Sequence, residues 1–258
     1  MDRSALLLPD WPDAPTNIGA LATTRAGGVS TGPYDDGRGG GGLNLGLHVG
    51  DDLEAVQANR ARLQALLPAR PAWLSQVHGN AVVDAASVGP DQPVRVGDAS
   101  IAVGAGAVCA ILTADCLPVL FADQGGKVVG AAHAGWRGLA GGVLQATAGA
   151  MRAAGAGEIT AWLGPAIGPA AFEVGAEVLD SFVAALPAAE ARAAFAPLPG
   201  RPGKYLADIY RLARLALAQD GITRVSGGQF CTVTTPERFY SYRRDRITGR
   251  QASLIWLK

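Results

Sequence analysis

Three polar residues interrupt apolar, strand-like segments of this 258-residue chain: His78, Cys116 and His133. Each lies at the end of a predicted strand and beside a turn signal, and strand ends at one sheet edge can bring distant side chains together. A thiolate and two imidazoles are good zinc ligands, and three protein ligands leave a fourth position for water or substrate. Such a site lowers the pKa of bound water toward neutrality. These residue types predict an open, catalytic metal site.

The same residues also have a purely structural interpretation. A cysteine packs well as a small core residue, and interior histidines can be merely hydrogen-bonded. No two of them have the close CxxC or HxxxH spacing of many metal sites, so spacing alone leaves both interpretations open. The chain has only three histidines and three cysteines, which leaves few competing ligands. Cys109 and Cys231 are expected to be structural, and His48 to lie at the surface or behind the ligands.

Arginines at glycine-rich turns are candidates for binding phosphate. Arg137 follows His133 in AAHAGWRG, just before a predicted helix start whose backbone N–H groups attract anions. Arg25 in TTRAGGVS and the pair Arg243–Arg244 are further candidates, because a guanidinium binds phosphate with two parallel hydrogen bonds. For each of them an ordinary surface charge is the alternative.

Predicted strands position the three candidate ligands. Strand patterns cover VCAILTA, PVLFAD, VVGAAHA and ITAWLG, with a turn at Gly125–Gly126. The segments WLSQV and AVVDA flank His78–Gly79–Asn80, which predicts a hairpin or a sharp bend with His78 at a strand end.

Helical patterns cover the ranges 53–67, 138–154, 175–186 and 205–219. Asp51 and Asp52 are candidate N-terminal caps of the first. Pro187 stops the third, and Gly221 is suited to close the fourth.

The remaining segments are less regular. Residues 239–257 are expected to form a hairpin that turns near Thr248–Gly249, and the glycine run 37–42 a mobile loop. Strands and helices are mixed without strict alternation, which predicts one mixed α/β or α+β domain over residues 1–258.

Composition excludes several classes of partner. The formal net charge is zero, only 17% of residues are charged, and no basic block is present, so nucleic acid is not expected to bind. No stretch approaches the ~20 apolar residues of a membrane helix. Three cysteines are too few for a disulfide scaffold, which favours reduced thiols and a cytoplasmic location. The sequence leaves the oligomeric state open.

A series of ordered motifs resembles one bacterial family. The motifs are TTRAGGVS (23–30), LNLGLHVGDD (43–52), SQVHGN (75–80), TADCLPVL (113–120), AAHAGWRG (131–138), LGPAIGP (163–169), FEVG (172–175) and FYSYRRDRITGRQAS (239–253). They are similar to those of the proteins once called multicopper polyphenol oxidases or laccase-domain proteins. That family includes the peptidoglycan editing factor and proteins described as purine nucleoside phosphorylases.

The resemblance implies a fold, an activity and a set of site residues. The fold would be a single α+β domain of layered helices and mixed β-sheets, similar to a toxin deamidase with a Cys–His centre. The zinc ligands and catalytic residues would be His78, Cys116 and His133. Substrate- and phosphate-binding candidates within the motifs are Arg25, Ser30, Asn44, Arg137 and Arg243.

The implied reaction is phosphorolysis of purine nucleosides such as adenosine, inosine and methylthioadenosine, with some adenosine deamination. The partners would be the nucleoside and phosphate, and the cofactor Zn²⁺. The chain departs from the family pattern in two places. Ala170 and Ala171 stand where members often carry a cysteine, and the loop 35–42 before LNLG is longer than usual.

Two other activities use the same residues. Cys116 could attack an amide of a misassembled cell-wall precursor with His133 as base, which fits the editing-factor branch. Copper-dependent phenol oxidation is the older family label, but a multicopper cluster needs many more histidines than the three present. Cu²⁺ is therefore expected only as an adventitious occupant of the zinc site. A non-catalytic binding role is the weakest alternative.

Overall fold

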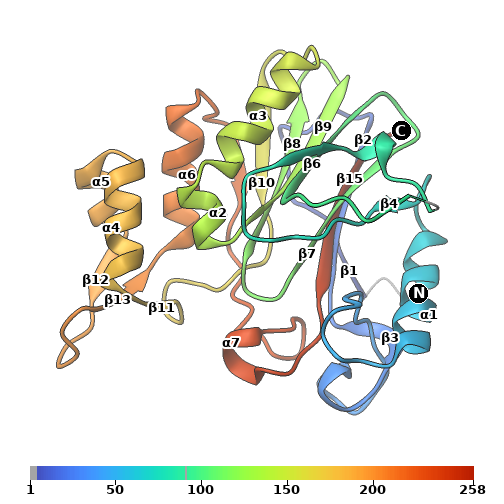
Figure 1. The fold of residues 1–258 in the computed structure, drawn as a ribbon, viewed down its shortest axis with the longest axis horizontal. Helices are drawn as coiled ribbons and strands as arrows, with labels where there is room; N and C mark the ends of the chain where they lie inside the picture. The colour runs from blue at the N-terminus through green and yellow to red at the C-terminus, as the bar shows by residue number, and fades with distance from the viewer. Residues whose placement is uncertain (1–4, 91) are drawn as a thin grey trace.

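Two β-sheets packed face to face form the centre of the computed structural model, which describes residues 5–90 and 92–258 (Figure 1). The five-stranded sheet has the order β1 (Leu6–Leu7), β2 (Ile18–Thr23), β15 (Gln251–Leu257), β7 (Val108–Thr113) and β4 (Pro71–Ala72). The six-stranded sheet has the order β14 (Val225–Gly227), β10 (Ile159–Leu163), β8 (Leu117–Asp123), β9 (Val128–Ala134), β6 (Ala99–Val103) and β5 (Val82–Asp84). The mixed α+β domain predicted from the sequence is confirmed.

The central strands are buried on both faces, because each face packs against another layer. Leu120 and Ala122 of β8 join the apolar cluster between the two sheets. Their neighbours Val119 and Phe121 point the other way, into the cluster under the helices. This alternation follows from the two-residue period of a strand, and it explains why VCAILTA, PVLFAD and VVGAAHA are apolar throughout.

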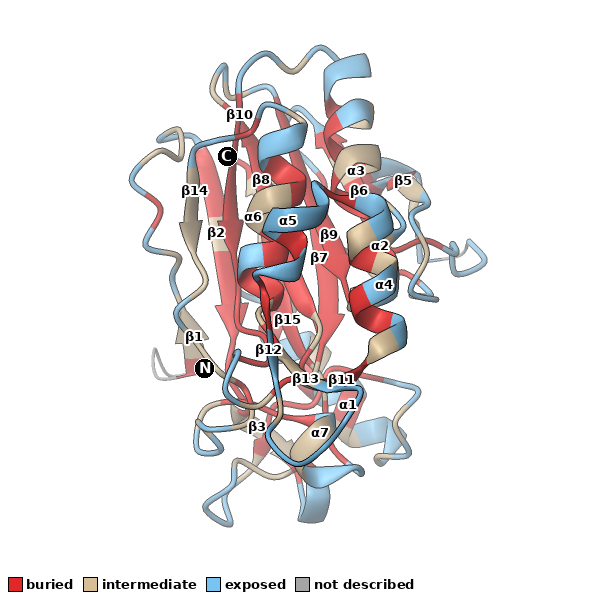
Figure 2. Ribbon diagram, turned by 90° about the vertical axis from the view of Figure 1, so that its left-hand side faces the viewer, coloured by how far each residue is buried: buried red, intermediate tan, exposed pale blue. Residues whose placement is uncertain are grey.

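Helices cover both outer faces of the pair of sheets (Figure 1). The six-stranded sheet packs against α3 (Val143–Ala153) and α6 (Ile209–Gln219), with α2 (Trp136–Ala140), α4 (Ala176–Ala185) and α5 (Ala188–Arg192) beside them. On the other side, α1 (Leu53–Gln64) buries Leu63 against the five-stranded sheet. Figure 2 shows the same layering, with buried strands at the centre and exposed outer helix faces. Smaller elements are β3 (Ala26–Ser30), the sheet β11 (Glu173–Gly175), β13 (Lys204–Ala207) and β12 (Phe195–Pro197), and α7 (Tyr242–Asp245).

Several predicted boundaries are confirmed by specific contacts. Asp52 caps α1, since its carboxylate accepts a hydrogen bond from the N–H of Ala55 at 2.8 Å. Asp51 is not a cap, because its carboxylate accepts from Asn44 instead. Gly221, with φ +77°, follows α6 as predicted.

Three predicted helices were wrong in extent. The helix predicted over 53–67 ends earlier, at Gln64. The range 138–154 is not one helix, because Gly142 adopts φ +82° and breaks the helical path between α2 and α3. α2 already begins at Trp136, so Arg137 lies in its first turn and not before it. The range 205–219 begins with β13, which pairs with β11 and β12, and α6 starts only after the cap Asp208.

The predicted C-terminal hairpin was also wrong, and of the two forms predicted around His78 the structure has the bend. The segment 239–250 contains the short helix α7, and β15 pairs with β2 and β7 rather than with its own preceding residues. The segments around His78 do not pair with each other, since Ser75 bridges to Val96 and β5 pairs with β6. His78 therefore lies in a sharp bend, the other form that the sequence allowed, and not at a strand end.

Candidate metal centre and the cavity around it

The chain crosses between the two sheets where Cys116 lies. It leaves the five-stranded sheet at the end of β7, turns through residues 114–116, and enters the six-stranded sheet as β8. His133 is the penultimate residue of β9, the neighbour of β8, and Pro118 is its partner in the ladder. The two candidate ligands on this sheet therefore meet at one edge, as the sequence predicted.

His78 completes the cluster from its bend. One ligand atom from each of His78, Cys116 and His133 lies within 4.8 Å of the other two. The distance between Cys116 Sγ and His78 Nε2 is 3.7 Å, and the two imidazole rings are edge to face with centroids 4.7 Å apart. His133 is buried, whereas His78 is exposed to the cavity.

Asp98 holds two of the three candidate ligands. Its carboxylate is fully buried and accepts a hydrogen bond from His133 Nδ1 at 2.8 Å. The same carboxylate accepts from the consecutive backbone N–H groups of Val77, His78 and Gly79 at 3.1, 2.8 and 2.7 Å. These contacts keep His78 at φ +62°, a left-handed conformation that a histidine rarely adopts. Asp98 thus orients the His133 ring, whose Nε2 is left for a ligand, and fixes the bend of His78.

A second strained residue precedes Cys116. Asp115 has φ +94°, and its carboxylate accepts hydrogen bonds from Thr232 Oγ1 and from the backbone N–H of Arg243, both at 2.6 Å. Its carbonyl accepts a hydrogen bond from the N–H of Ile167. Contacts from three distant residues, Ile167, Thr232 and Arg243, therefore hold the turn that presents the thiol of Cys116.

Gly135 gives the three side chains room to meet. A Cβ atom at this position would lie 2.9 Å from Cys116 Sγ and 2.9 Å from His78 Cδ2. Real Cβ atoms do not approach heavy atoms so closely, so any larger residue would push the cluster apart. This explains the glycine after AAHA in physical terms.

The thiol of Cys116 and the imidazole of His133 shift each other's pKa. Burial works to raise the pKa of the Cys116 thiol, but the charge of His133 and hydrogen bonds with His133 and His78 outweigh it and lower the pKa to about 6. Burial likewise works to lower the pKa of His133, but the Cys116 thiolate and Asp98 raise it to about 9. Without a metal, the pair is a thiolate beside an imidazolium at neutral pH.

The donor set fits a metal ion. It offers one thiolate sulfur and two imidazole nitrogens, which bind borderline cations, and a buried carboxylate behind one imidazole. His78, Cys116 and His133 would hold the ion, and the exposure of His78 to the cavity leaves room for a further ligand.

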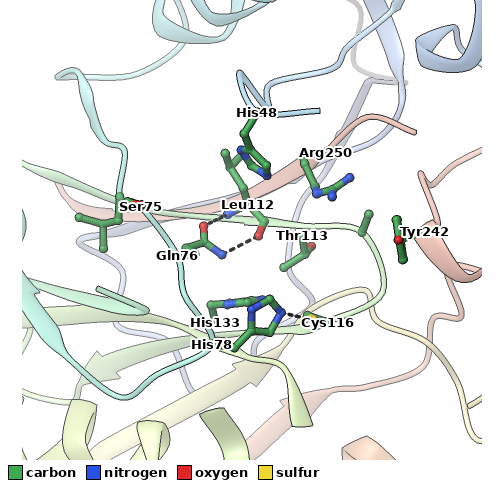
Figure 3. Close-up of a pocket in the computed structure, with 12 residues that line it drawn as sticks. His48, Ser75, Gln76, His78, Leu112, Thr113, Cys116, His133, Tyr242 and Arg250 are labelled. Carbon is green, nitrogen blue, oxygen red and sulfur yellow. Dashed lines mark hydrogen bonds between the residues drawn. The ribbon is translucent and has the colours of Figure 1, made fainter. Parts of the chain in front are cut away.

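The cluster forms one wall of a cavity of about 650 Å³. Figure 3 shows His78, Cys116 and His133 on one side and His48 and Arg250 on the opposite side. Gln76 lies between them. Its side chain is fixed because its amide makes two hydrogen bonds with the backbone of Leu112. The cavity is therefore bounded by a wall of candidate ligands and a wall with a cationic side chain.

A smaller, more apolar cavity of about 160 Å³ adjoins the first. Cys116, Ala114 and Tyr242 line both, and Trp136, Ile167, Phe172 and Ile209 line the smaller one with Asp115 and Arg243. This side cavity offers aromatic and aliphatic surfaces next to the thiol.

Three of the predicted substrate-binding residues are engaged in structural contacts. Arg25 is buried and donates to the carbonyls of Asp35 and Pro236 and to the Asp35 carboxylate. Ser30 is buried, and its hydroxyl accepts a hydrogen bond from Asn59. The buried amide of Asn44 bonds to Gly46, Asp51 and the N–H of Arg250. The structure brings none of these three into the lining of either cavity.

The other two predicted arginines have different positions. Arg137 is exposed, stacks on the ring of Trp136 at 4.3 Å, and does not line either cavity. Arg243 lines the side cavity, where its Nη1 donates to the carbonyl of Glu173 at 2.9 Å. Among the five predicted substrate-binding residues, only Arg243 lines one of the two cavities beside the candidate metal ligands.

Sequence reasoning missed Asp98, Gln76, Tyr242 and Arg250. Asp98 had one usable signal, an acidic residue at the entry to an otherwise apolar strand. Arg250 had none that separates it from the other arginines of the motif FYSYRRDRITGRQAS. The structural role expected for Cys109 is confirmed, since its thiol is buried between the sheets. Cys231 accepts a hydrogen bond from the N–H of Gly168, and His48 lines the cavity away from the candidate ligands.

No helix in residues 5–90 and 92–258 is long and apolar enough to cross a membrane.

Comparisons with known proteins agree with this architecture. The family model described as multi-copper polyphenol oxidoreductase laccase matches residues 19–258. A Pseudomonas aeruginosa protein named purine nucleoside phosphorylase is 55% identical over 255 residues, 99% of each chain. The Escherichia coli protein named purine nucleoside phosphorylase YfiH is 50% identical over 256 residues, 98% of this chain and 99% of that protein. A crystal structure of a Neisseria meningitidis protein has a TM-score of 0.90 at 49% identity, covering 98% of this chain and 99% of that one.

Proposed function

This chain belongs to the multi-copper polyphenol oxidoreductase laccase family, and on that premise we propose that it is a zinc-dependent purine nucleoside phosphorylase. The observation that carries the proposal is the cluster of His78, Cys116 and His133 in the wall of a cavity of about 650 Å³. The names of relatives that are 55% and 50% identical over nearly the whole chain support the reaction type.

The metal proposed is zinc. One thiolate and two imidazoles with an open fourth position match the donor sets of catalytic zinc sites. When bound, zinc supplies a Lewis acid that polarises an oxygen of a ligand or lowers the pKa of a bound water. Copper could occupy the same donors, but the chain has three histidines in total, too few for a multicopper cluster.

The side cavity supports a nucleoside substrate. Its aromatic and aliphatic lining, Trp136, Phe172 and Ile167, suits the faces of a purine base. A base held there would place the ribose beside Cys116, where the two cavities meet. In phosphorolysis a phosphate oxygen forms a bond to the anomeric carbon, and the bond to the base nitrogen breaks. The base leaves with that electron pair and takes up a proton.

The substrates proposed are adenosine, inosine and methylthioadenosine, with deamination of adenosine as a slower side reaction. Zinc held by His78, Cys116 and His133 would supply an activated water near neutral pH, which supports deamination as a side reaction. We also propose a cytoplasmic location, which the three unpaired cysteines support.

A second candidate function is amide hydrolysis by Cys116. One observation favours it: the pKa of Cys116 is lowered to about 6 by His133 and His78 against the effect of burial, so the thiol is a nucleophile at neutral pH. A thiolate that coordinates zinc is not free to attack, so metal content separates the two candidates. Stoichiometric, tightly bound zinc supports phosphorolysis, and an active metal-free protein supports hydrolysis.

The experiment is to load the purified protein with one equivalent of zinc and incubate it with adenosine, with and without phosphate. Chromatography should detect adenine and ribose 1-phosphate only when phosphate is present. Equal release of adenine in phosphate-free buffer would make the protein a nucleoside hydrolase, and no adenine in either buffer would refute nucleoside cleavage.

A further inference from the structure

The cavity wall opposite the candidate metal ligands is cationic. Arg250 and His48 lie on it, facing His78, Cys116 and His133 across the cavity (Figure 3). Among the described residues that line this cavity, none is an aspartate or glutamate. An anion in the cavity would therefore meet the charge of Arg250 on the wall opposite the candidate metal ligands, with no carboxylate among the described lining residues.

The guanidinium of Arg250 is anchored on one side and free on the other. Its Nη1 donates to the carbonyls of Thr248 and Gly249 at 3.1 and 3.0 Å, and its backbone N–H donates to Asn44 at 2.8 Å. Its Nε and Nη2 have no hydrogen-bond partner among residues 5–90 and 92–258, although all five guanidinium N–H groups are donors. Nε and Nη2 together form the fork that binds two oxygens of a phosphate.

The surroundings reinforce the positive charge. Burial lowers the pKa of His48, and the nearby charges of Arg250 and Arg60 lower it further, so this part of the wall disfavours another cation. Arg60 is held beside it by stacking on Trp73 at 4.4 Å and by donating to the carbonyl of Leu45 at 2.9 Å. The charges of Arg250 and Arg60, which add to the effect of burial on His48, also stabilise an anion.

A glycine gives the Arg250 side chain its space. A Cβ atom on Gly46 would lie 2.8 Å from Cγ of Arg250, so the glycine of the LNLG motif leaves the space that the arginine side chain fills.

We propose that Arg250, with His48 beside it, binds the phosphate co-substrate across the cavity from the metal ligands. The inference rests on the proposed phosphorolysis for the identity of the anion. It places the attacking phosphate on the cationic wall and the purine base in the side cavity, on the two sides of the ribose. It also transfers the phosphate-binding role from Arg25, whose donors are used by carbonyls and Asp35, to Arg250.

The test measures phosphate binding directly, without a nucleoside. Calorimetric titration of the zinc-loaded protein with inorganic phosphate is compared between wild type and Arg250→Gln. Loss of a charged hydrogen-bonding group should weaken phosphate binding by about ten- to a hundredfold. Arg250→Lys keeps the charge without the fork and should lose about tenfold, and His48→Asn should lose less than Arg250→Gln.

Control variants separate this site from others. Arg224→Gln removes an exposed arginine that pairs with Glu158 on the surface, and it should bind phosphate as wild type does. Arg137→Gln tests the exposed arginine beside Trp136 and should also match wild type. Zinc content and melting temperature are measured for each variant. If Arg250→Gln does not fold, the phosphate affinity of Arg250→Lys is compared with that of the wild type instead.

The outcomes distinguish the two proposals. If Arg250→Gln and Arg250→Lys bind phosphate within twofold of wild type, the phosphate site is refuted even if adenosine is phosphorolysed. If phosphate binding depends on Arg250 but adenosine is not cleaved, the anion site stands and the proposed function is wrong. In the active enzyme, the KM for phosphate should rise in Arg250→Gln more than kcat falls.

Discussion

The two walls of the cavity are built by different means. On the wall of the candidate metal ligands His78, Cys116 and His133, called the metal wall below, Cys116 lies just before one central strand and His133 near the end of the next. The fully buried Asp98 holds the third candidate ligand, His78, in a left-handed bend. On the cationic wall, His48 and Arg250 come from loops, and the guanidinium is anchored by carbonyls of its own turn. Metal coordination tolerates errors of only tenths of an ångström, whereas a charge attracts an anion over a longer distance.

The two walls differ in how firmly the backbone around their functional side chains is held. Around the metal ligands each turn that departs from ordinary backbone geometry is held by several hydrogen bonds to a carboxylate, at Asp98 and at Asp115. The guanidinium of Arg250 is held by only two hydrogen bonds, both from Nη1, so that Nε and Nη2 stay available to a ligand. Substitutions should therefore act on zinc or on phosphate, according to the wall they alter.

The largest effect is expected from Asp98→Asn. An amide cannot accept from three backbone N–H groups and from His133 as a carboxylate does, so both His78 and His133 lose their orientation. Zinc affinity should fall about ten- to a hundredfold. A competing chelator measures it, and Asp84→Asn, at an exposed turn cap, is the matched control. Unchanged zinc affinity in Asp98→Asn would show that the metal wall does not depend on this carboxylate.

Gly135→Ala tests the space between the ligands. The added Cβ would meet Cys116 Sγ and His78 Cδ2 at 2.9 Å, so the cluster must open. We expect about tenfold weaker zinc binding and a cost of about 1–3 kcal/mol in stability from overpacking. Gly149→Ala is the matched control, because a Cβ there meets nothing within 4 Å in α3 and should stabilise the protein by about 0.5–1 kcal/mol. Equal zinc affinity in both variants would contradict the close-packed centre.

The pH dependence of zinc binding reports the protonation of the metal wall. The pKa of Cys116 is lowered to about 6 by His133 and His78 despite burial, and that of His133 is raised to about 9 by Cys116 and Asp98 despite burial. Between these values the free site holds a thiolate and a protonated His133, which must lose its proton to bind zinc. Apparent zinc affinity should thus rise about tenfold per pH unit in this window, and proton release should accompany binding. A flat profile would show that His133 is neutral before zinc binds.

Gly46→Ala should have the smallest effect, and it should act on the cationic wall. Its Cβ would meet Cγ of Arg250 at 2.8 Å and displace the guanidinium. We expect phosphate binding to weaken about fivefold, the factor that ~1 kcal/mol represents, with zinc content unchanged. Loss of zinc in this variant would mean that the two walls are not independent.

The sequence predicted the metal wall better than the cationic wall for a physical reason. Histidine and cysteine are scarce here, and in an apolar strand they are conspicuous, so His133 and Cys116 could be found from type and position. Arginine is common and reaches far, so its role depends on what its donors contact. The guanidinium of Arg25 donates its hydrogen bonds to backbone carbonyls, whereas Arg250 keeps donors available for a ligand. This difference is visible only in the folded structure.

The fold shows the same division between local and distant determinants. Local sequence was enough to predict some elements. Apolar runs indicated the strands β7, β8, β9 and β10, and Pro187 indicated where α4 ends. The hairpin expected near the C-terminus was wrong, because β15 pairs with β2 and β7, which lie far away in the sequence. Likewise Lys204–Ala207 is extended because β11 and β12 lie on its two sides, which no local pattern encodes.

Zinc-edge X-ray absorption on the protein loaded with one equivalent of zinc tests the central claim most directly. A site made by His78, Cys116 and His133 requires one sulfur at about 2.3 Å and two imidazole nitrogens at about 2.0–2.1 Å, with a lighter atom in the fourth position. The sulfur contribution should disappear in Cys116→Ser. A wild-type spectrum without sulfur, or one unchanged by that substitution, would contradict the assignment of these residues as the metal centre.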